Sequence, residues 1–215
     1  YKMGENSLDV LKGINLSIEE GDFVAILGPS GSGKSTLMNQ VGVLDKPTKG
    51  KVFIDGVDIN KYSESDLAQI RGKKVGFIFQ QFNLINTLTA LENVTLPALF
   101  TGMEESARVK RGKHLLKSVG LEERYHHKPN ELSGGQQQRV AIARSLINDP
   151  SIILADEPTG NLDSKSGRAI METLENLNDE GKTIVLITHD IDLVKYSKKI
   201  VYIRDGLIEK IVSSK

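Results

Sequence analysis

The chain has no cysteine, no net charge and no long apolar run. Without cysteine there is no disulfide framework, which fits a reducing compartment. Its 28 basic side chains balance 28 acidic ones, so no overall field draws the molecule to nucleic acid or anionic lipid. No apolar run approaches the roughly 20 residues that span a bilayer, and no signal peptide is recognisable. These absences predict a soluble, intracellular protein that recognises its partners locally.

Short apolar runs alternate with helical spacing along most of the 215 residues. The runs at 23–27, 75–79, 152–155 and 183–187 predict buried strands, and the spacing predicts helices over 34–45, 63–71 and 164–178. Residues 14–18 predict a half-buried strand, because Ile14, Leu16 and Ile18 alternate with polar residues. Hairpins are expected at Asp55-Gly56 and at Asp205-Gly206.

The middle of the chain differs from both ends. Between Thr89 and Gly120 the β-branched runs vanish and apolar residues recur at helical intervals, which indicates a helical insertion. The whole pattern predicts an α/β fold with a mostly parallel sheet covered on both faces and antiparallel pieces at each end.

A phosphate-binding motif follows the first buried strand. Residues 28–36 read GPSGSGKST and match G-x-x-x-x-G-K-[ST]. Glycines let main-chain N–H groups wrap phosphates, Lys34 reaches the β- and γ-phosphates, and the Ser35 hydroxyl can ligate Mg²⁺. We call residues 28–36 the cradle. Its remaining members are expected to contact nucleotide through the main chain or hydroxyl groups: Gly28, Pro29, Ser30, Gly31, Ser32, Gly33 and Thr36.

The cradle alone fits a kinase, a GTPase or an ATPase. Guanine recognition usually needs Asn-Lys-x-Asp, and here Asn60-Lys61 is followed by Tyr62-Ser63. GTP is therefore not the expected nucleotide.

Two carboxylates end a later apolar strand. Asp156 and Glu157 close SIILADE, and the carboxyl ends of parallel strands share one edge of a sheet with the cradle. Asp156 can then hold Mg²⁺ through water, and Glu157 can orient or deprotonate an attacking water. This arrangement favours hydrolysis. The alternative is that Glu157 only caps a turn before Pro158.

Two other polar residues follow strands. His189 comes after TIVLI and could donate a hydrogen bond to a γ-phosphate. Gln80 comes after VGFIF, where its amide could reach Mg²⁺ and the attacking water. Taken alone, a His-Asp pair is more often an ordinary helix start, and a glutamine at a strand end has little meaning by itself.

A second candidate anion site starts a helix far from the cradle in sequence. Residues 130–145 read NELSGGQQQRVAIARS, in which Ser133, Gly134, Gly135 and Gln136 precede helical spacing. Bare N–H groups at a helix start attract anions. The residues alone do not show which anion this second site would serve.

The ordered set of GPSGSGKS, Gln80, LSGGQ, ILADE, NLD and His189 resembles the nucleotide-binding domain of an ABC ATPase over essentially the whole chain. The resemblance implies a P-loop NTPase core with the antiparallel β part at 1–79 and 148–215. It assigns 80–147 to the glutamine loop, a helical subdomain and the signature helix. It also implies ATP and Mg²⁺ as cofactors, with Ser35, Gln80 and Asp156 at the metal.

In that family two copies pair head to tail, and each ATP lies between one cradle and the other copy's LSGGQ. The resemblance therefore implies that Ser133 to Gln136 face a partner's γ-phosphate. It places Asp163 at the dimer seam and Tyr1 on the adenine.

The stretch from Phe77 to Phe100 is most similar to family members that serve lipoprotein release, macrolide export or peptide resistance. This similarity implies a separate membrane permease that contacts the region from Gln80 to Leu88. It also implies a cytoplasmic location on the inner face of the membrane. Apolar residues of this region would form part of the docking patch, or would instead seal the helical insertion onto the sheet; they are Phe82, Leu84, Ile85 and Leu88.

Two other functions remain open. A related ATPase of the cell-division type would signal across the membrane without moving cargo. A nucleic-acid-associated ABC protein usually has a long coiled coil or tandem domains, which are not found here, so no nucleic-acid partner is expected. We interpret as solvated surface the basic run Arg108, Lys110, Arg111 and Lys113 and the pair His126-His127.

Overall fold

The computed structural model describes residues 1–3 and 6–213. Its main sheet has the strand order β10-β9-β3-β8-β7-β6. All neighbouring pairs are parallel except β10 with β9, which forms an antiparallel edge. The strands are β3 (Phe23–Leu27), β6 (Val75–Phe79), β7 (Ile152–Asp156), β8 (Thr183–Thr188), β9 (Lys199–Arg204) and β10 (Leu207–Ser213).

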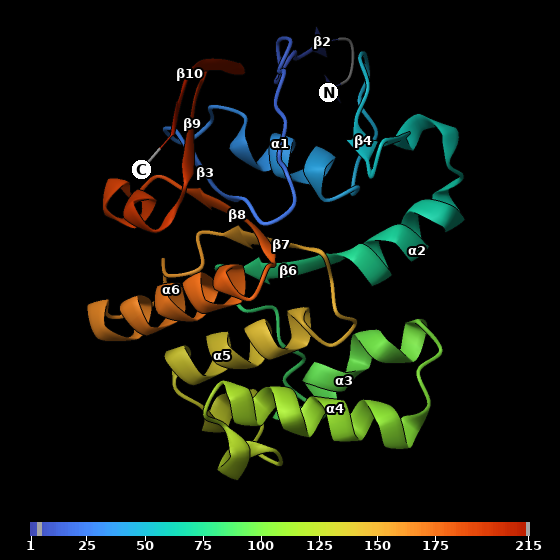
Figure 1. Cartoon of the computed structure of the whole chain (residues 1–215), viewed down its shortest axis with the longest axis vertical. Coiled ribbons are helices and arrows are strands. Elements are labelled where there is room, and N and C mark those ends of the chain that lie inside the picture. Colours follow the sequence, from blue (N-terminus) through green and yellow to red (C-terminus); the bar gives the residue numbers. More distant parts are fainter. Residues whose placement is uncertain (4–5, 214–215) are drawn as a thin grey trace.

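Helices cover both faces of this sheet (Figure 1). Helix α1 (Lys34–Val41) lies on one face, and α5 (Gly134–Ser145) and α6 (Ser164–Asp179) lie on the other. Helices α3 (Ala90–Phe100) and α4 (Glu105–Ser118) form a further layer beyond α5, while α2 (Glu64–Lys74) leads into β6. The predicted P-loop α/β fold and its helical insertion are confirmed.

Alternation along the central strand divides the core into two parts. Phe23 and Ala25 of β3 point into the cluster that α5 and α6 help to form, and Val24 and Ile26 point toward α1. Because successive side chains of a strand face opposite sides, a fully apolar strand is needed where both faces are covered. All five residues of β3 are buried. The strand that ends at the cradle is therefore held rigidly from both sides.

Small antiparallel sheets complete the fold. Strands β4 (Phe53–Ile54) and β5 (Val57–Asp58) form the hairpin expected at Asp55-Gly56, and β1 (Lys2–Met3) pairs with β2 (Asn6–Ser7). Asp55 and Gly56 both have positive φ, as a two-residue turn of this kind requires. Short 3₁₀ turns occur at Ile59–Lys61, Glu122–Arg124, Pro129–Glu131 and Ile191–Tyr196.

One expected strand is absent, and two expected helices end at other residues. Residues 14–18 form no strand, although Ile14, Leu16 and Ile18 do pack against the core beneath α1. Alternating burial arises here without a hydrogen-bonded partner strand. Helix α1 ends at Val41 instead of near Asp45, and Val43 beyond it takes a positive φ. Helix α2 continues three residues past Arg71, to Lys74, and runs directly into β6.

Among the described residues, no helix has the length and apolar character that crossing a membrane requires. The division of the chain at 79/80 and 147/148 stays a prediction.

Candidate functional site

The cradle follows β3 and begins α1. Gly31 and Gly33 have φ of 79° and 101°, in the left-handed region where an L side chain is strained. Gly33 is the N-cap of α1 and has no side chain with which to close the helix end. The N–H groups at this helix start therefore remain available to an anion.

Backbone packing fixes the position of the cradle. A Cβ on Gly28 would lie 2.2 Å from the carbonyl oxygen of Ile203 in β9, so only glycine fits there. The N–H of Gly206 in the β9–β10 turn donates to the carbonyl of Ser32 at 3.0 Å. The Ser32 hydroxyl is buried and has no partner among the described residues. An unsatisfied buried hydroxyl in a loop of this shape fits a site that is completed by a ligand.

Lys34 turns into the cradle. Its ammonium donates to the carbonyls of Gly28 and Pro29, both at 2.8 Å. Burial lowers the pKa of Lys34, and the charges of Glu157 and Asp156 oppose this shift. The lysine is thus bound by two carbonyls of the cradle, which it can exchange for phosphate oxygens.

Asp156 and Glu157 lie at the carboxyl end of β7, as predicted. Burial raises the pKa of Asp156, the charge of Glu157 raises it further, and Lys34 lowers it. Glu157 has a φ of 45°, a strained value for a residue with a side chain, and its N–H donates to Ile187 in β8. A partly buried carboxylate next to a residue with strained backbone is common at functional positions, and the catalytic role of Glu157 stays a prediction.

His189 contacts Glu157 directly. Its Nδ1 lies 2.6 Å from Oε1 of Glu157, and its main-chain N–H donates to the same oxygen at 3.0 Å. The hydroxyl of Thr188 donates to the other oxygen, Oε2, at 3.1 Å. A cleft of about 380 Å³ beside the cradle is lined by His189 together with Gly28 and Pro29. The structure therefore brings His189, Glu157 and the cradle to one place.

The donor set fits Mg²⁺ with phosphate rather than Mg²⁺ alone. Ser35 is exposed at the helix start. The pKa of Asp156 is raised by burial and by the charge of Glu157, so a nearby cation would stabilise its carboxylate. Over residues 1–3 and 6–213 no group of three or more His, Asp or Glu side chains could hold an ion by itself. Mg²⁺ characteristically takes one or two protein ligands and completes its shell with water and substrate phosphates.

Gln80 does not point at the cradle. Its amide Nε2 lies 3.4 Å from Oδ1 of Asn161, and the Asn161 amide donates to the Gln80 carbonyl at 2.9 Å. A role for Gln80 at the metal stays a prediction, and it requires the side chain to turn.

The second helix start is capped and lies at the surface. Ser133 accepts a hydrogen bond from the N–H of Gln136 at 3.3 Å, and Gln136 accepts one from the N–H of Ser133 at 2.9 Å. This reciprocal pair is a capping box. Beside Gly134 and Gly135 the nearest side chains are Leu162, Phe82 and Ser166, none of which belongs to the cradle. The two predicted anion sites on one chain are thus separate structures.

Comparison with known proteins identifies the family. The ABC transporter family profile matches residues 11–160. The chain is 57% identical to the ABC transporter ATP-binding protein MJ0796 of Methanocaldococcus jannaschii, with 98% of this chain and 92% of that protein covered. The chain belongs to the ABC transporter family.

Another relative of this ABC protein is much longer, and MJ0796 itself has been solved as a dimer. This chain is 54% identical to MacB of Bdellovibrio bacteriovorus, which is named as a macrolide export ATP-binding/permease protein. The matched region covers 97% of this chain but 32% of MacB. A dimeric post-hydrolysis structure of the MJ0796 cassette, bound to ADP and Pi, matches with a TM-score of 0.91 at 53% identity, over 100% of this chain and 95% of that one. The resemblance inferred from the motifs is confirmed, and the chain is an ATP-binding subunit of a transporter system.

Tyr1 is not placed at the cradle of this ABC domain. Its hydroxyl donates to Asp45 at 3.4 Å, beyond the C-terminal end of α1, whereas the cradle lies at the N-terminal end. Main-chain hydrogen bonds between Tyr1 and Leu8 hold it there. Stacking of Tyr1 on adenine stays a prediction.

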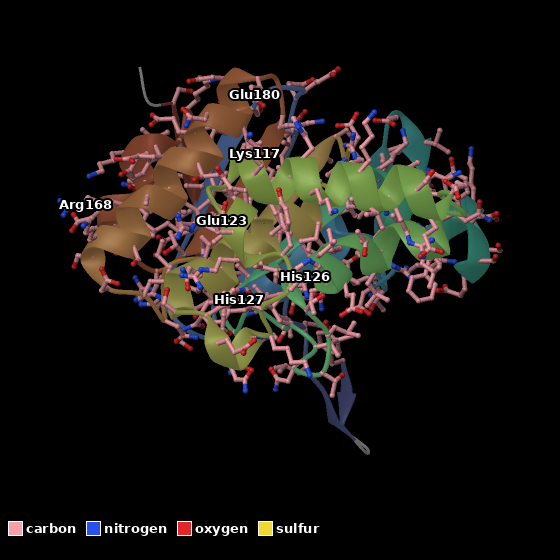
Figure 2. All side chains as sticks on the ribbon, turned by 90° about the horizontal axis from the view of Figure 1, so that it is seen from below. Lys117, Glu123, His126, His127, Arg168 and Glu180 are labelled. Carbon is pink, nitrogen blue, oxygen red and sulfur yellow. The ribbon has the colours of Figure 1, made fainter. Side chains whose placement is uncertain are left out.

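The basic run on α4 is only partly a solvated face. Arg111 donates to the carbonyls of Ile147 and Leu146 at 2.6 and 3.2 Å, so the expectation of a solvated side chain was wrong for this residue. Its guanidinium joins α4 to the end of α5. His126 is exposed and His127 is half-buried, and both lie on the outer surface near the end of α4 (Figure 2).

Sequence reasoning missed Thr188, and it included Asn161 only as the first residue of the NLD motif, without a role of its own. Thr188 is fully buried and orients Glu157, and Asn161 binds Gln80. Thr188 immediately precedes His189, so its position at the end of an apolar strand was the available signal. The contact of Asn161 with Gln80 had no such signal, because the two residues are 81 positions apart.

Proposed function

We propose that this chain hydrolyses ATP as one half of a head-to-tail homodimer and drives a conformational change in a separate membrane permease of the exporter type. The observation that carries the proposal is the separation of the two anion sites. The lysine of the cradle has two carboxylates near it, Asp156 and Glu157, while the capped start of α5 is at the surface, with Phe82, Leu162 and Ser166 nearest to its glycines. A second copy can supply the α5 start that one cradle lacks.

The dimeric MJ0796 cassette structures support this pairing. In the proposed dimer, the N–H groups of Gly134 and Gly135 face the γ-phosphate held by the partner's Lys34, and Asp163 lies at the seam. A helix N-terminus provides about half a positive charge at that point. ATP then joins the two copies, and loss of the γ-phosphate releases them.

Each residue of the site has a role in hydrolysis. Glu157 accepts a proton from the attacking water, and Thr188 and His189 hold its carboxylate in place. With Nδ1 of His189 facing Glu157, the Nε2 edge remains for the γ-phosphate. Ser35, Asp156 and, once its side chain has turned, Gln80 would hold Mg²⁺, which would neutralise charge on the phosphates when bound. Lys34 shares that task from the cradle side.

A cleft of about 400 Å³ is the proposed permease contact. Its lining includes Arg71 of α2, Phe79 of β6, Pro97 of α3 and Arg144 of α5, and Asn83 is its member from the glutamine loop. Of the apolar residues expected at this patch, Ile85 is 43% exposed, whereas Leu84 packs against the core. Leu84 thus fits the sealing role, and the exposed Ile85 is the side chain that we assign to the contact with a partner. Burying an exposed side chain of this size contributes about 1.5 to 3 kcal/mol before ordering costs.

The test is Glu157→Gln. This variant should bind ATP, turn it over at least about 100-fold more slowly, and accumulate as a dimer, because removing the base blocks the step that releases the partner. Size-exclusion chromatography at micromolar protein and saturating ATP measures the dimer. Glu64→Gln changes an exposed carboxylate and should leave turnover and the monomer unaffected. A Glu157→Gln protein that stays monomeric with ATP bound would contradict the shared site.

A further inference from the structure

The contact between the glutamine loop and the segment after Glu157 suggests a role for Asn161, the first residue of the NLD motif. We infer that Asn161 is a positioning residue for Gln80, fixing its main chain while leaving its side chain free to turn toward the nucleotide. This inference rests on the proposed role of Gln80 at Mg²⁺.

The two hydrogen bonds between these residues differ in quality. The Asn161 amide donates to the Gln80 carbonyl at 2.9 Å, which is an optimal length. The Gln80 amide reaches Oδ1 of Asn161 only at 3.4 Å, near the limit for a hydrogen bond. Turning the side chain therefore breaks the weak contact and keeps the strong one. Asn161 can act as a fixed pivot for Gln80.

Gly160 gives the Gln80 side chain its resting place. A Cβ on Gly160 would lie 2.7 Å from Nε2 and 3.1 Å from Cδ of Gln80. The side chain thus lies over a residue without a side chain, where it can leave without steric obstruction.

The rest of the glutamine loop is held by another element. Arg144 of α5 donates to the carbonyls of Phe82 and Asn83, both of which have positive φ. Gln138 of α5 donates to the carbonyl of Pro158 at 2.6 Å and reaches that of Phe79 at 3.4 Å. The carbonyls on either side of Gln80 are thus bound by α5, while the carbonyl of Gln80 is bound by Asn161. Asn161 therefore connects the loop proposed to contact the permease with the segment that carries Glu157 and Asp163.

Asn161 is exposed, so truncating it leaves no cavity. The change should alter turnover rather than folding. Asn161→Ala removes a hydrogen bond of about 1 kcal/mol, so we expect kcat to fall roughly fivefold and the Mg²⁺ concentration for half-maximal rate to rise by a similar factor. Nucleotide affinity should stay within about twofold, because the cradle is unchanged.

The decisive experiment is a double-mutant cycle measured by steady-state ATP hydrolysis over a Mg²⁺ titration. If Asn161 acts through Gln80, Gln80→Ala and the Gln80→Ala/Asn161→Ala double variant should hydrolyse ATP at the same rate. Gly160→Ala displaces the Gln80 amide without strain on φ and should lower kcat as well. Asn15→Ala removes an exposed amide that donates to the carbonyl of Gly13 at 3.5 Å, and should leave the rate unchanged.

Additive effects of the two changes, or wild-type kinetics for Asn161→Ala, would overturn the positioning role while Gln80→Ala remains impaired. Wild-type kinetics for Gln80→Ala would instead remove Gln80 from the proposed function, and the role of Asn161 with it. Equal melting temperatures for Asn161→Ala and the parent exclude a loss of folding as the cause.

Discussion

The N-terminal ends of α1 and α5 differ in how their main-chain N–H groups are bound. Both are glycine-rich helix N-termini that can hold an anion. At α1 the cap is the left-handed Gly33, and a buried lysine and two carboxylates surround it. At α5 the cap is Ser133, closed by Gln136. The first start has a lysine and two carboxylates beside it, whereas the capping box of the second binds the N–H groups of Ser133 and Gln136, and the N–H groups of Gly134 and Gly135 are what it can offer to an anion.

The largest expected effect comes from removing the cation that only the first start has. Lys34→Ala should lower ATP affinity and turnover by at least about 100-fold, because a desolvated charge contact to phosphate is lost. Fluorescent-nucleotide titration and phosphate release measure the two quantities. Lys46→Ala removes a lysine that also donates to a carbonyl, that of Tyr62 at 2.9 Å, and should retain both. If Lys34→Ala bound ATP as tightly as the parent, the lysine would not distinguish the start of α1 from that of α5 as a phosphate site.

The second start is tested by blocking it. Ser133→Arg should leave nucleotide affinity within about twofold and reduce turnover at least about tenfold, because a long side chain would occupy the space for the partner's phosphate. Ser63→Arg is the matched control, since Ser63 caps α2 with the same kind of capping box. Normal turnover in Ser133→Arg would show that α5 does not face a nucleotide.

Charge is the next difference between the two starts. Burial and Glu157 raise the pKa of Asp156 above its ordinary value of 3.8, so the folded protein holds this proton more tightly than the unfolded chain. The carboxylate therefore costs stability as pH rises through the window above 3.8, and the full cost is present above the raised pKa. Asp156→Asn should raise the melting temperature at pH 7 by a few degrees, or about 1 kcal/mol, while it reduces Mg²⁺-dependent turnover.

Calorimetry without nucleotide at several pH values checks this sign. The advantage of Asp156→Asn should shrink as pH falls toward 3.8. A variant less stable than the parent at pH 7 would show that attraction to Lys34 outweighs the cost of burying the Asp156 carboxylate. The two helix starts would then differ less in charge than we infer.

The smallest effect concerns the capping box. Gln136→Ala should lower the free energy of unfolding by about 1 kcal/mol, because the N–H of Ser133 loses its partner. Glu92→Ala breaks the equivalent box at α3, where Glu92 accepts from Thr89 at 2.8 Å. Chemical denaturation should give similar losses for the two variants. Only Gln136→Ala should also weaken ATP-dependent dimerisation, which separates the capping role from the proposed contact with a partner.

Most elements of the fold could be predicted from local patterns. Phe23 to Leu27 is apolar throughout because helices cover both of its sides, and that requirement is visible in the sequence. Residues 14–18 were misassigned because alternate burial needs only a surface to pack on, while a strand needs a hydrogen-bonding neighbour. Periodicity reports the first condition and not the second.

The candidate site was predictable to different degrees. Glu157 and Asp156 were found because parallel strands end at one edge, and the structure does place them there. The position of the Gln80 side chain against Asn161 could not be predicted, because a hydrogen bond between residues 81 positions apart produces no periodic pattern in the sequence.

By itself the sequence determined which local structures are possible: the left-handed glycines of the cradle, the capped start of α5 and the carboxylates at the end of an apolar strand. These depend on the residues within a few positions of each other. Only the tertiary structure decided that Lys34 rests on the cradle carbonyls, that His189 and Thr188 bind Glu157, and that Gln80 lies over Gly160. Such contacts depend on how strands distant in sequence are ordered in the sheet, because the order sets which side chains come within hydrogen-bonding distance.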